Sequence, residues 1–161
     1  MNDRDGSTAP TLTPGGLRDL DAVMDVMEDS FDPAFGEAWT APQCSGLMPL
    51  PGVWLTLARC GEQVVGFALC RIILDEAELL LLAVKKKCQG LGIGRKLLDE
   101  FVRTAAGRGA TRVHLEVRQG NHAVKLYKSA GFIEVGRRRG YYNGCDGQVY
   151  DALTLSRSTS A

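Results

Sequence analysis

The stretch from residue 79 to residue 95 constrains the fold more than any other. It begins with Leu79–Val84, a short and continuous apolar run that is typical of a fully buried strand. Polar residues follow, and three glycines then alternate at Gly90, Gly92 and Gly94. Beyond them, apolar residues recur at helical spacing as far as Ala105. The sequence therefore predicts a buried strand, a glycine-rich turn and an amphipathic helix in succession.

A glycine-rich turn that leads into a helix is suited to bind an anion. The first N–H groups of a helix lack partners within the helix and lie at the positive end of its dipole. Glycine also lets the backbone approach a phosphate group closely. The alternative is that the three glycines only form a tight turn. Basic residues on both sides, at 85–87 and at 95–96, favour a phosphate ligand.

Two well-known phosphate loops do not fit this stretch. A Walker A loop ends in Gly-Lys-Ser/Thr, whereas Gly94 is followed by arginine. The dinucleotide fingerprint Gly-x-Gly-x-x-Gly accounts for Gly90 and Gly92, and Glu116 follows near the place of its ribose-binding acid. That fingerprint needs a third glycine, which is absent, and a turn that leaves its strand directly. Here a polar link separates the strand from the glycines.

The run Gln89-Gly90-Leu91-Gly92-Ile93-Gly94 resembles the Gln/Arg-x-x-Gly-x-Gly/Ala signature of the GCN5-related N-acetyltransferases (GNAT family). In this family the loop holds the pyrophosphate of acetyl-CoA. The open edge of the preceding strand hydrogen-bonds the pantetheine arm, because the central strands splay apart. The resemblance therefore implies acetyl-CoA as cosubstrate, with contacts from Leu82, Ala83, Val84, Gln89, Gly90, Leu91, Gly92, Ile93, Gly94, Arg95 and Asn121.

The likeness extends from about residue 12 to residue 155 and is closest to the ribosomal-protein-alanine N-acetyltransferases (RimI type). It implies a mixed α/β, GNAT-like fold, in which a mostly antiparallel central sheet with splayed central strands carries helices on both faces. Besides the glycine loop, the similar stretches are 74–79, 115–118 with Asn121, and 126–132, with weaker matches at 138–142 and 151–153.

The resemblance assigns the catalytic roles to Glu116 and Tyr127. Glu116 is the expected general base, acting through water, and Tyr127 the expected acid that protonates the departing sulfur. An α-amine has an unperturbed pKa near ~8, so a base is useful at neutral pH. Glu116 lies on the polar face of a strand otherwise suited to the core. The alternatives are a salt bridge from Glu116 to Arg118, Arg112 or a neighbour, and simple ring packing for Tyr127.

Three points stay open at this level. The chain has one residue fewer between Asn121 and Tyr127 than the family pattern. One residue turns a helical side chain by about 100°, so either the preceding loop absorbs the deletion or these two residues do not both occupy family positions. The lysines at 85–87 either aid the 3′-phosphate of CoA or are simply solvated. His114 and His122 are rival bases.

Composition narrows the class of protein. The chain has 161 residues, of which 45% are hydrophobic and 24% charged, as in a single globular domain with a substantial core. Lys plus Arg and Asp plus Glu both number 19, so net charge gives no reason to expect nucleic acid or a membrane as partner. Five scattered cysteines, no Cys-x-x-Cys pair and two histidines give no zinc pattern. We expect no metal, reduced thiols and a cytoplasmic location, because no apolar run approaches the ~18 residues that span a bilayer.

The remaining elements are predicted from local signals. We expect a polar tail at 1–12 and one N-acetyltransferase domain at 13–155. The other expected elements are a helix capped at Thr13-Pro14 and ending near Ser30, a loop at 31–52 with a short helix from Thr40, and a hairpin of 53–59 with 63–73 bulged near Gly66. They continue with a helix to about Arg108, a strand at 112–118, a short helix from Gly120 or Asn121 to Gly131, strands at 132–135, 137–142 and 148–155, and a tail at 156–161.

The function expected from the sequence is acetyl-CoA-dependent acetylation of a protein N-terminal α-amine, possibly that of a ribosomal protein. A small-molecule amine is the alternative acceptor. A module that binds acyl-CoA without turnover is the alternative of another class. The acceptor side is expected in the loop at 31–52 and at 140–147, where exposed aromatics either form a substrate wall or pack on the sheet.

Overall fold

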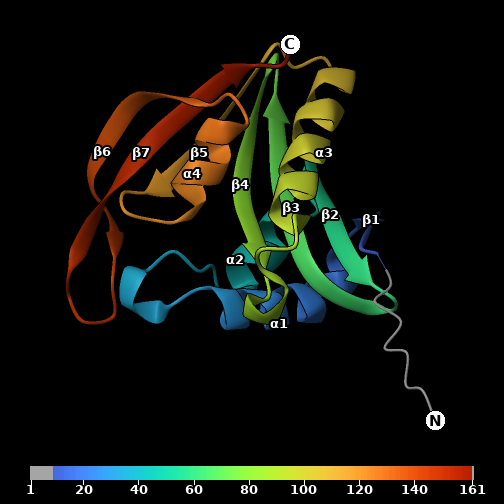
Figure 1. The fold of residues 1–161 in the computed structure, drawn as a ribbon, viewed down its shortest axis with the longest axis horizontal. Coiled ribbons are helices and arrows are strands. Elements are labelled where there is room, and N and C mark those ends of the chain that lie inside the picture. Colours follow the sequence, from blue (N-terminus) through green and yellow to red (C-terminus); the bar gives the residue numbers. More distant parts are fainter. Residues whose placement is uncertain (1–8, 161) are drawn as a thin grey trace.

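A computed structural model describes residues 9–160 of the chain, so residues 1–8 of the predicted tail at 1–12 lie outside the described residues. Seven strands form one sheet in the order β1-β2-β3-β4-β5-β7-β6, in which only the β4–β5 pair is parallel (Figure 1). The predicted mixed, mostly antiparallel fold is confirmed. The strands are β1 (Thr11–Gly15), β2 (Val53–Cys60), β3 (Gln63–Ile73), β4 (Glu76–Val84), β5 (Arg112–Arg118), β6 (Ile133–Asn143) and β7 (Val149–Ser158).

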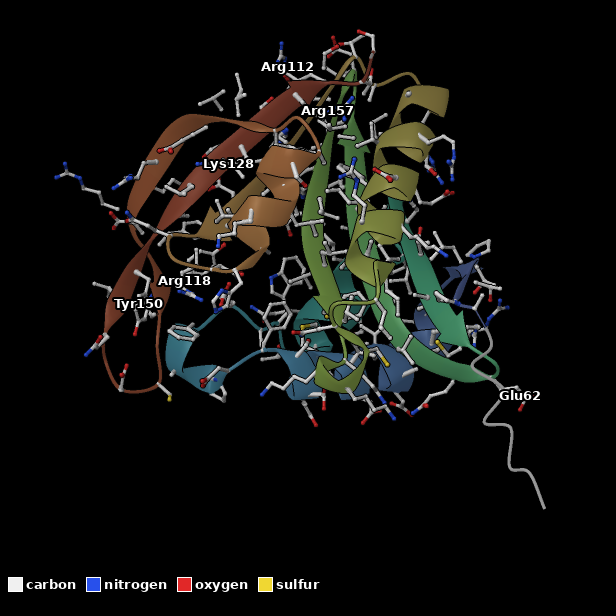
Figure 2. All side chains as sticks on the ribbon, viewed as in Figure 1. Glu62, Arg112, Arg118, Lys128, Tyr150 and Arg157 are labelled. Atoms are coloured by element: carbon white, nitrogen blue, oxygen red, sulfur yellow. The ribbon has the colours of Figure 1, made fainter. Side chains whose placement is uncertain are left out.

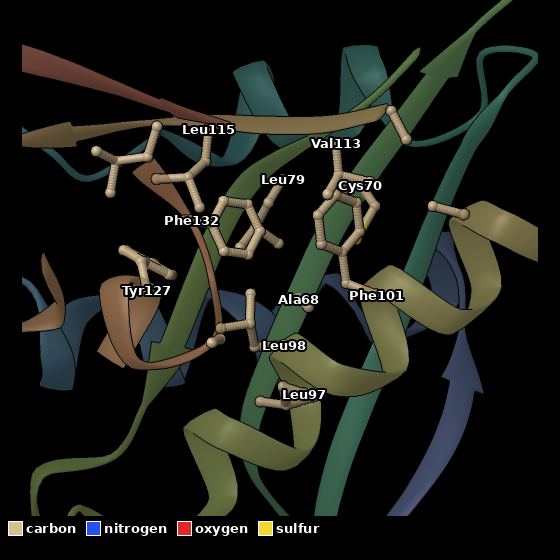
Figure 3. Packing of buried hydrophobic residues seen from close by; sticks show 14 of the residues in the cluster. Ala68, Cys70, Leu79, Leu97, Leu98, Phe101, Val113, Leu115, Tyr127 and Phe132 are labelled. Carbon is tan, nitrogen blue, oxygen red and sulfur yellow. The ribbon is translucent and has the colours of Figure 1, made fainter. Parts of the chain in front are cut away.

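Helices cover both faces of the sheet, as predicted. On one face α3 (Ile93–Gly107) and α4 (Ala123–Ser129) pack on a core that includes Leu97, Phe101 and Phe132 (Figure 3). On the other face α1 (Leu20–Ser30) and α2 (Ala41–Leu47) pack on a second core around Met27 and Phe67. Each such fully buried side chain stabilises the fold by about 1.5–3 kcal/mol.

The predicted short helix after Thr40 is confirmed as α2. The Thr40 side chain accepts a hydrogen bond from the Gln43 N–H at 3.3 Å, and the Gln43 side chain accepts one from the Thr40 N–H at 2.8 Å. This reciprocal capping box satisfies two N–H groups that a helix start leaves without partners. The hairpin of β2 and β3 is also confirmed, and its register shifts beside Gly66, where the bulge was expected.

The start of the chain corrects one prediction. Residues 11–15 form strand β1, not the end of a tail and the start of a helix, and helix α1 begins only at Leu20 after a 3-10 turn at Leu17–Asp19. β1 pairs with β2 along its whole length. Pro14 lacks an N–H, which an outermost strand tolerates. The local capping signal at Thr13 therefore yields to pairing with a strand some 40 residues away, a partner that the capping motif cannot reveal.

The C-terminal strands also differ from the prediction. The two strands expected at 132–135 and 137–142 are one strand, β6, whose register with β7 shifts near Gly136 and again near Gly140. The expected tail from residue 156 is still part of β7, which runs to Ser158. Ser156 is buried and donates a hydrogen bond to the Val113 carbonyl at 3.1 Å, so pairing with β5 holds this end in the sheet.

A bulge in β4 creates the feature on which the site depends. Leu79 faces Cys70 and Leu81 faces Leu69 across the β3–β4 pair, so Leu80 is an extra residue on β4. Such a bulge bends the strand and increases its twist. The side chain of Leu79 packs with the α3 core, whereas that of Leu81 packs with the α1 core.

The β4–β5 pair opens just before this bulge. Its last paired residues are Leu79 and Leu115, although β4 continues to Val84 and β5 to Arg118. Among the described residues no strand pairs with 80–84 on the β5 side. The predicted splay is confirmed, and it leaves backbone groups of β4 facing a gap in the middle of the sheet.

Candidate active site

A cavity of about 630 Å³ fills the gap between β4 and β5. Residues 80–84 of β4, the start of α3, residues 115–118 of β5 and the α4 region line it. The rest of the lining comes from a wall formed by residues 30–39 and from the two tyrosines at 141–142. Every site residue predicted from the sequence lies on its lining except Leu91, which is 68% exposed.

The glycine loop has the backbone that a close ligand requires. Gly90 and Gly92 have φ of 79° and 82°, in the left-handed region that favours glycine. Gly92 is the residue directly before α3, and a side chain at either glycine would enter open space. Gly94 is different, because a Cβ there would lie 3.4 Å from the Leu126 side chain. Two glycines thus keep the helix start accessible, and the third lets α3 approach α4.

The polar link between β4 and α3 is fixed to its surroundings. Gln89 donates a hydrogen bond from Nε2 to the Val84 carbonyl at 3.0 Å, which ties the loop to the strand end. Lys85 Nζ lies 2.8 Å from the Asp25 carboxylate on α1. Lys85 is therefore ion-paired and not simply solvated, which corrects that alternative, whereas a contact with the 3′-phosphate of CoA stays a prediction. Lys86 and Lys87 remain exposed.

Glu116 lies in β5 with its carboxylate at the cavity and its side chain 13% exposed. Its Oε1 lies 3.0 Å from Nε of Arg138, and its Oε2 accepts a hydrogen bond from the Thr154 hydroxyl at 3.3 Å. The salt bridge considered from the sequence therefore exists, but its partner comes from β6 and not from Arg112 or Arg118. These two contacts orient the carboxylate.

Tyr127 of α4 lines the same cavity and is 6% exposed. Its ring packs edge-on against Phe132, with centroids 6.1 Å apart. Burial, and after it the negative charge of Glu37, raises the pKa of the Tyr127 hydroxyl. Tyr142 also lines the cavity, and its pKa is raised by burial first and by Glu37 second. Both phenols therefore keep their protons at neutral pH.

Asn121 and Tyr127 line the cavity together, so the shorter spacing between them does not separate them. Asn121 precedes α4, which begins at Ala123 and not at residue 120 or 121 as predicted. The Asn121 side chain accepts a hydrogen bond from the Ala123 N–H at 2.8 Å and donates one to Glu37 Oε2 at 2.8 Å.

The rival histidines are in different places. His122 lines the cavity directly before α4, whereas His114 is not part of the lining. Nε2 of His114 lies 3.8 Å from the carboxylate of Glu78 on the neighbouring strand. Only His122 is near enough to the cavity to compete with Glu116 as a base.

The segment between α1 and α2 forms a wall that is attached to the β6–β7 end. A Cβ on Gly36, which has φ of 67°, would lie 1.9 Å from the Asn143 carbonyl oxygen. A Cβ on Gly144 would lie 2.1 Å from the Ala34 carbonyl oxygen. The Cys145 N–H also donates to the Pro33 carbonyl at 3.3 Å. The wall therefore depends on direct backbone contact between two segments far apart in the sequence.

We expect Gly36→Ala to lower the melting temperature, because alanine is strained at this φ and its methyl group overlaps the Asn143 carbonyl. The loss should reach about 1–3 kcal/mol or more. Gly46→Ala is the matched control, since Gly46 lies inside α2 with open space around an added methyl group. It should be neutral or stabilise by about 0.5–1 kcal/mol. Thermal unfolding of both variants checks this, and equal melting temperatures would contradict it.

Sequence reasoning missed three residues of this site: Glu37, Arg138 and Tyr142. It named Arg118 only as a possible partner of Glu116, whereas Arg118 pairs with Glu37. The available signal was weak. Glu37 lies between Phe35 and Trp39, and an acidic residue among aromatics in a predicted substrate wall indicates a site residue. Its partners could not be named, because Arg118 and Asn121 follow it by 81 and 84 residues.

Comparison with known proteins now decides the family. A model of the acetyltransferase (GNAT) family matches residues 20–132. The chain belongs to this family. The matched range includes the glycine loop, Glu116 and Tyr127, so the GNAT resemblance inferred from the sequence is confirmed. Among residues 9–160, no group of histidine, cysteine and acidic side chains suits a metal ion, and no helix is long and apolar enough to cross a membrane.

Relatives within the GNAT family are similar over part of their length. The chain is 37% identical over 95 residues to the ribosomal protein bS18-alanine N-acetyltransferase of Haemophilus influenzae, over 59% of this chain and 65% of that protein. It is 43% identical over 107 residues to N-alpha-acetyltransferase RimI of Mycobacterium tuberculosis, which is 63% of this chain and 64% of that protein. The chain thus spans about two thirds of the length of the curated relatives it matches.

Solved GNAT structures are similar over nearly the whole chain. The ribosomal-protein-S18-alanine N-acetyltransferase from Escherichia coli has a TM-score of 0.85 and 29% identity, covering 95% of this chain and 96% of that one. Ard1 from Thermoplasma volcanium has a TM-score of 0.80 and 25% identity, covering 94% and 98%. The RimI-type likeness is therefore confirmed in sequence and in fold.

Proposed function

We propose that this protein is an acetyl-CoA-dependent N-acetyltransferase that acts on the N-terminal α-amine of a protein. One observation carries the proposal: the open edge of β4, the accessible start of α3, Glu116 and Tyr127 all face one cavity. Relatives named as ribosomal protein bS18-alanine N-acetyltransferases support the choice of acceptor. Such an acceptor also favours a cytoplasmic location.

The residues present fit acetyl-CoA. The N–H groups at the start of α3, next to Gly90 and Gly92, offer unpaired donors to a pyrophosphate. The edge at 82–84 pairs with no strand on the β5 side, so its backbone groups other than the Val84 carbonyl, which Gln89 binds, are offered to an extended amide chain. Arg95 is the third residue of α3 and lines the cavity. When bound there, acetyl-CoA supplies a reactive acetyl thioester.

Glu116 is positioned to take the proton of the acceptor amine. An α-ammonium group must lose a proton before its nitrogen can attack, and its unperturbed pKa of about 8 leaves most of it protonated at pH 7. Contacts from Arg138 and Thr154 orient the Glu116 carboxylate at the cavity.

Tyr127 is positioned to donate a proton to the departing thiolate. Its raised pKa means that the hydroxyl is protonated throughout the neutral range. Tyr127 is 6% exposed, and a placed donor in such a water-poor position is more effective than bulk solvent. Glu116 and Tyr127 thus divide the two proton transfers between them, one at the nitrogen and one at the sulfur.

Incubation with acetyl-CoA and peptides tests the proposed function. We expect thiol release, and a gain of one acetyl group, with a peptide that begins with a free alanine amine. The same peptide with a blocked N-terminus and a free lysine should not react. A library of peptides that differ in their first residue then ranks N-terminal residues by the rate at which they are acetylated. Binding of acetyl-CoA without thiol release with any peptide, or turnover with small amines alone, would contradict the proposal.

We predict that Gly92→Val weakens acetyl-CoA binding by at least about tenfold. A branched side chain at φ of 82° is strained and also occupies the space in front of the α3 N–H groups. Gly61→Val is the matched control, because Gly61 also has positive φ and open space but lies in the β2–β3 turn. Calorimetry on both folded variants measures the two dissociation constants. Equal affinity for acetyl-CoA would reject the loop assignment.

A further inference from the structure

Glu37 is a buried carboxylate at the cavity that the reaction described so far does not use. Its side chain is 10% exposed, and Oε1 lies 3.0 Å from Nε of Arg118. Its other oxygen, Oε2, accepts a hydrogen bond from Asn121 Nδ2 at 2.8 Å. Each carboxylate oxygen therefore serves one donor. A buried carboxylate is unfavourable without such partners, so its position is set by these two contacts.

The contact with Asn121 leads to the start of α4. The Oδ1 atom of Asn121 accepts the N–H of Ala123, the first residue of the helix, at 2.8 Å. Tyr127 follows four residues later, about one helical turn onward. The orientation of the Asn121 amide is determined, because Glu37 can only accept and the Ala123 N–H can only donate. One chain of hydrogen bonds thus joins the wall to the helix that carries Tyr127.

The contact with Arg118 holds the other side of Glu37. The Arg118 guanidinium lies 3.7 Å from the centroid of the Phe35 ring and donates to the Gln119 carbonyl at 3.2 Å. Phe35 in turn packs edge-on against Tyr150 of β7, with centroids 5.4 Å apart. Figure 2 shows Arg118 beside Tyr150, above the segment that leads to α2. Glu37, itself part of the wall, is therefore fixed to β5 through Arg118, and it is not a mobile surface acid.

We propose that Glu37 is a positioning residue for acetyl transfer, which fixes the start of α4 through Asn121 and so holds the Tyr127 hydroxyl at the reacting sulfur. This inference rests on the proposed role of Tyr127 as the acid. The negative charge of Glu37 also contributes to the raised pKa of Tyr127, which keeps the donor protonated. The wall is thus coupled to the acid through the start of α4.

Glu37→Gln tests this because an amide cannot replace the carboxylate here. Both neighbours of Glu37 are donors, whereas glutamine has one acceptor oxygen and one NH₂ group. If the glutamine oxygen accepts from Arg118, its NH₂ group faces the Asn121 NH₂ group. If Asn121 rotates to relieve that conflict, its own NH₂ group faces the Ala123 N–H. One donor–donor conflict therefore persists at the start of α4 or at Arg118.

We expect Glu37→Gln to lower kcat about 10–100-fold, the cost of a small misplacement of a reacting group. The dissociation constant of acetyl-CoA should stay within about twofold, because the glycine loop and the β4 edge are untouched. Glu62→Gln, the same substitution in the exposed β2–β3 turn at the other end of the molecule (Figure 2), should leave kcat unchanged. A kcat equal to wild type in folded Glu37→Gln would overturn the proposal.

A double-mutant cycle separates positioning from a merely structural role. In a Tyr127→Phe background, Glu37→Gln should change kcat by less than about twofold, because the hydroxyl it positions is gone. If Tyr127→Phe lowers kcat and Glu37→Gln lowers it by its full factor of about 10–100-fold again in that background, Glu37 does not act through Tyr127. This inference then fails, while the proposed acid role of Tyr127 stands. If Tyr127→Phe alone keeps full kcat, the proposed acid role fails and this inference fails with it.

A second variant keeps the test valid if burial of an unpaired Arg118 prevents Glu37→Gln from folding. Asn121→Ala leaves the Glu37–Arg118 pair intact and removes only the connection to α4. At saturating acetyl-CoA it should lower kcat by a similar factor, and that effect should also disappear in the Tyr127→Phe background. Full kcat in Asn121→Ala, with circular dichroism showing the native helix content, would overturn the proposal.

Discussion

Glu116→Gln is expected to lower kcat/KM by about 10²–10⁴-fold near neutral pH, the usual contribution of a positioned base. Glutamine keeps the size of the side chain and removes its basicity. The loss should shrink as pH rises past about 8, because the acceptor α-amine then deprotonates without help. A pH–rate profile with a peptide acceptor measures both the size of the effect and its disappearance.

The alternative role for Glu116 is that of an ion-pair partner only. Arg138, on the other side of this pair, is 62% exposed, so solvent screening limits what the pair contributes to stability. A purely structural role predicts a lower melting temperature and a wild-type pH–rate profile. Glu134→Gln is the matched control, since Glu134 also faces an arginine on β6 but lies outside the cavity. It should leave both measurements unchanged.

Tyr127→Phe is expected to retain acetyl-CoA affinity and to lose about 10²–10⁴-fold in kcat. Only a hydroxyl is removed, so the edge-on packing against Phe132 should persist. Because burial raises the pKa of Tyr127, the wild-type enzyme should show no loss of this acid below about pH 10. Single-turnover kinetics at saturating substrates measure the chemical step directly.

Tyr150→Phe provides the matched control for this tyrosine. The Tyr150 hydroxyl donates to the Gln148 side chain at 3.3 Å, and the residue is not part of the cavity lining. Removal of the Tyr150 hydroxyl should leave kcat unchanged. An unchanged kcat for Tyr127→Phe as well would assign Tyr127 to ring packing, the alternative that its sequence position alone favours.

Much of the fold could be predicted because its signals are local. The apolar run 79–84, the glycines at 90, 92 and 94 and the helical spacing after them lie in one short stretch, and the structure has a strand, a turn and a helix there. The same holds for the hairpin of β2 and β3 and for the capped start of α2 at Thr40. Side-chain periodicity and capping depend on neighbours within a few residues, so they can be seen in the sequence.

The errors arose where distant pairing overrides a local preference. Thr13-Pro14 has the composition of a helix start, but the free edge of β2 takes residues 11–15 as a strand. Ser156 lies in a stretch that looks like a loose tail, yet it hydrogen-bonds Val113 of β5. Both cases depend on a strand edge that exists only once the sheet has formed.

The candidate site also combines features that are local in the sequence with contacts that form only in the folded chain. The sequence by itself determined the glycine loop, the strand before it, and the choice of Glu116 and Tyr127, because each belongs to a short motif of the GNAT family. Only the tertiary structure decided the partners of these residues: Arg138 for Glu116, and Glu37 with Asn121 for the helix that carries Tyr127. These partners lie on other elements, and a hydrogen bond between residues more than 80 positions apart leaves no periodic or local trace in the chain.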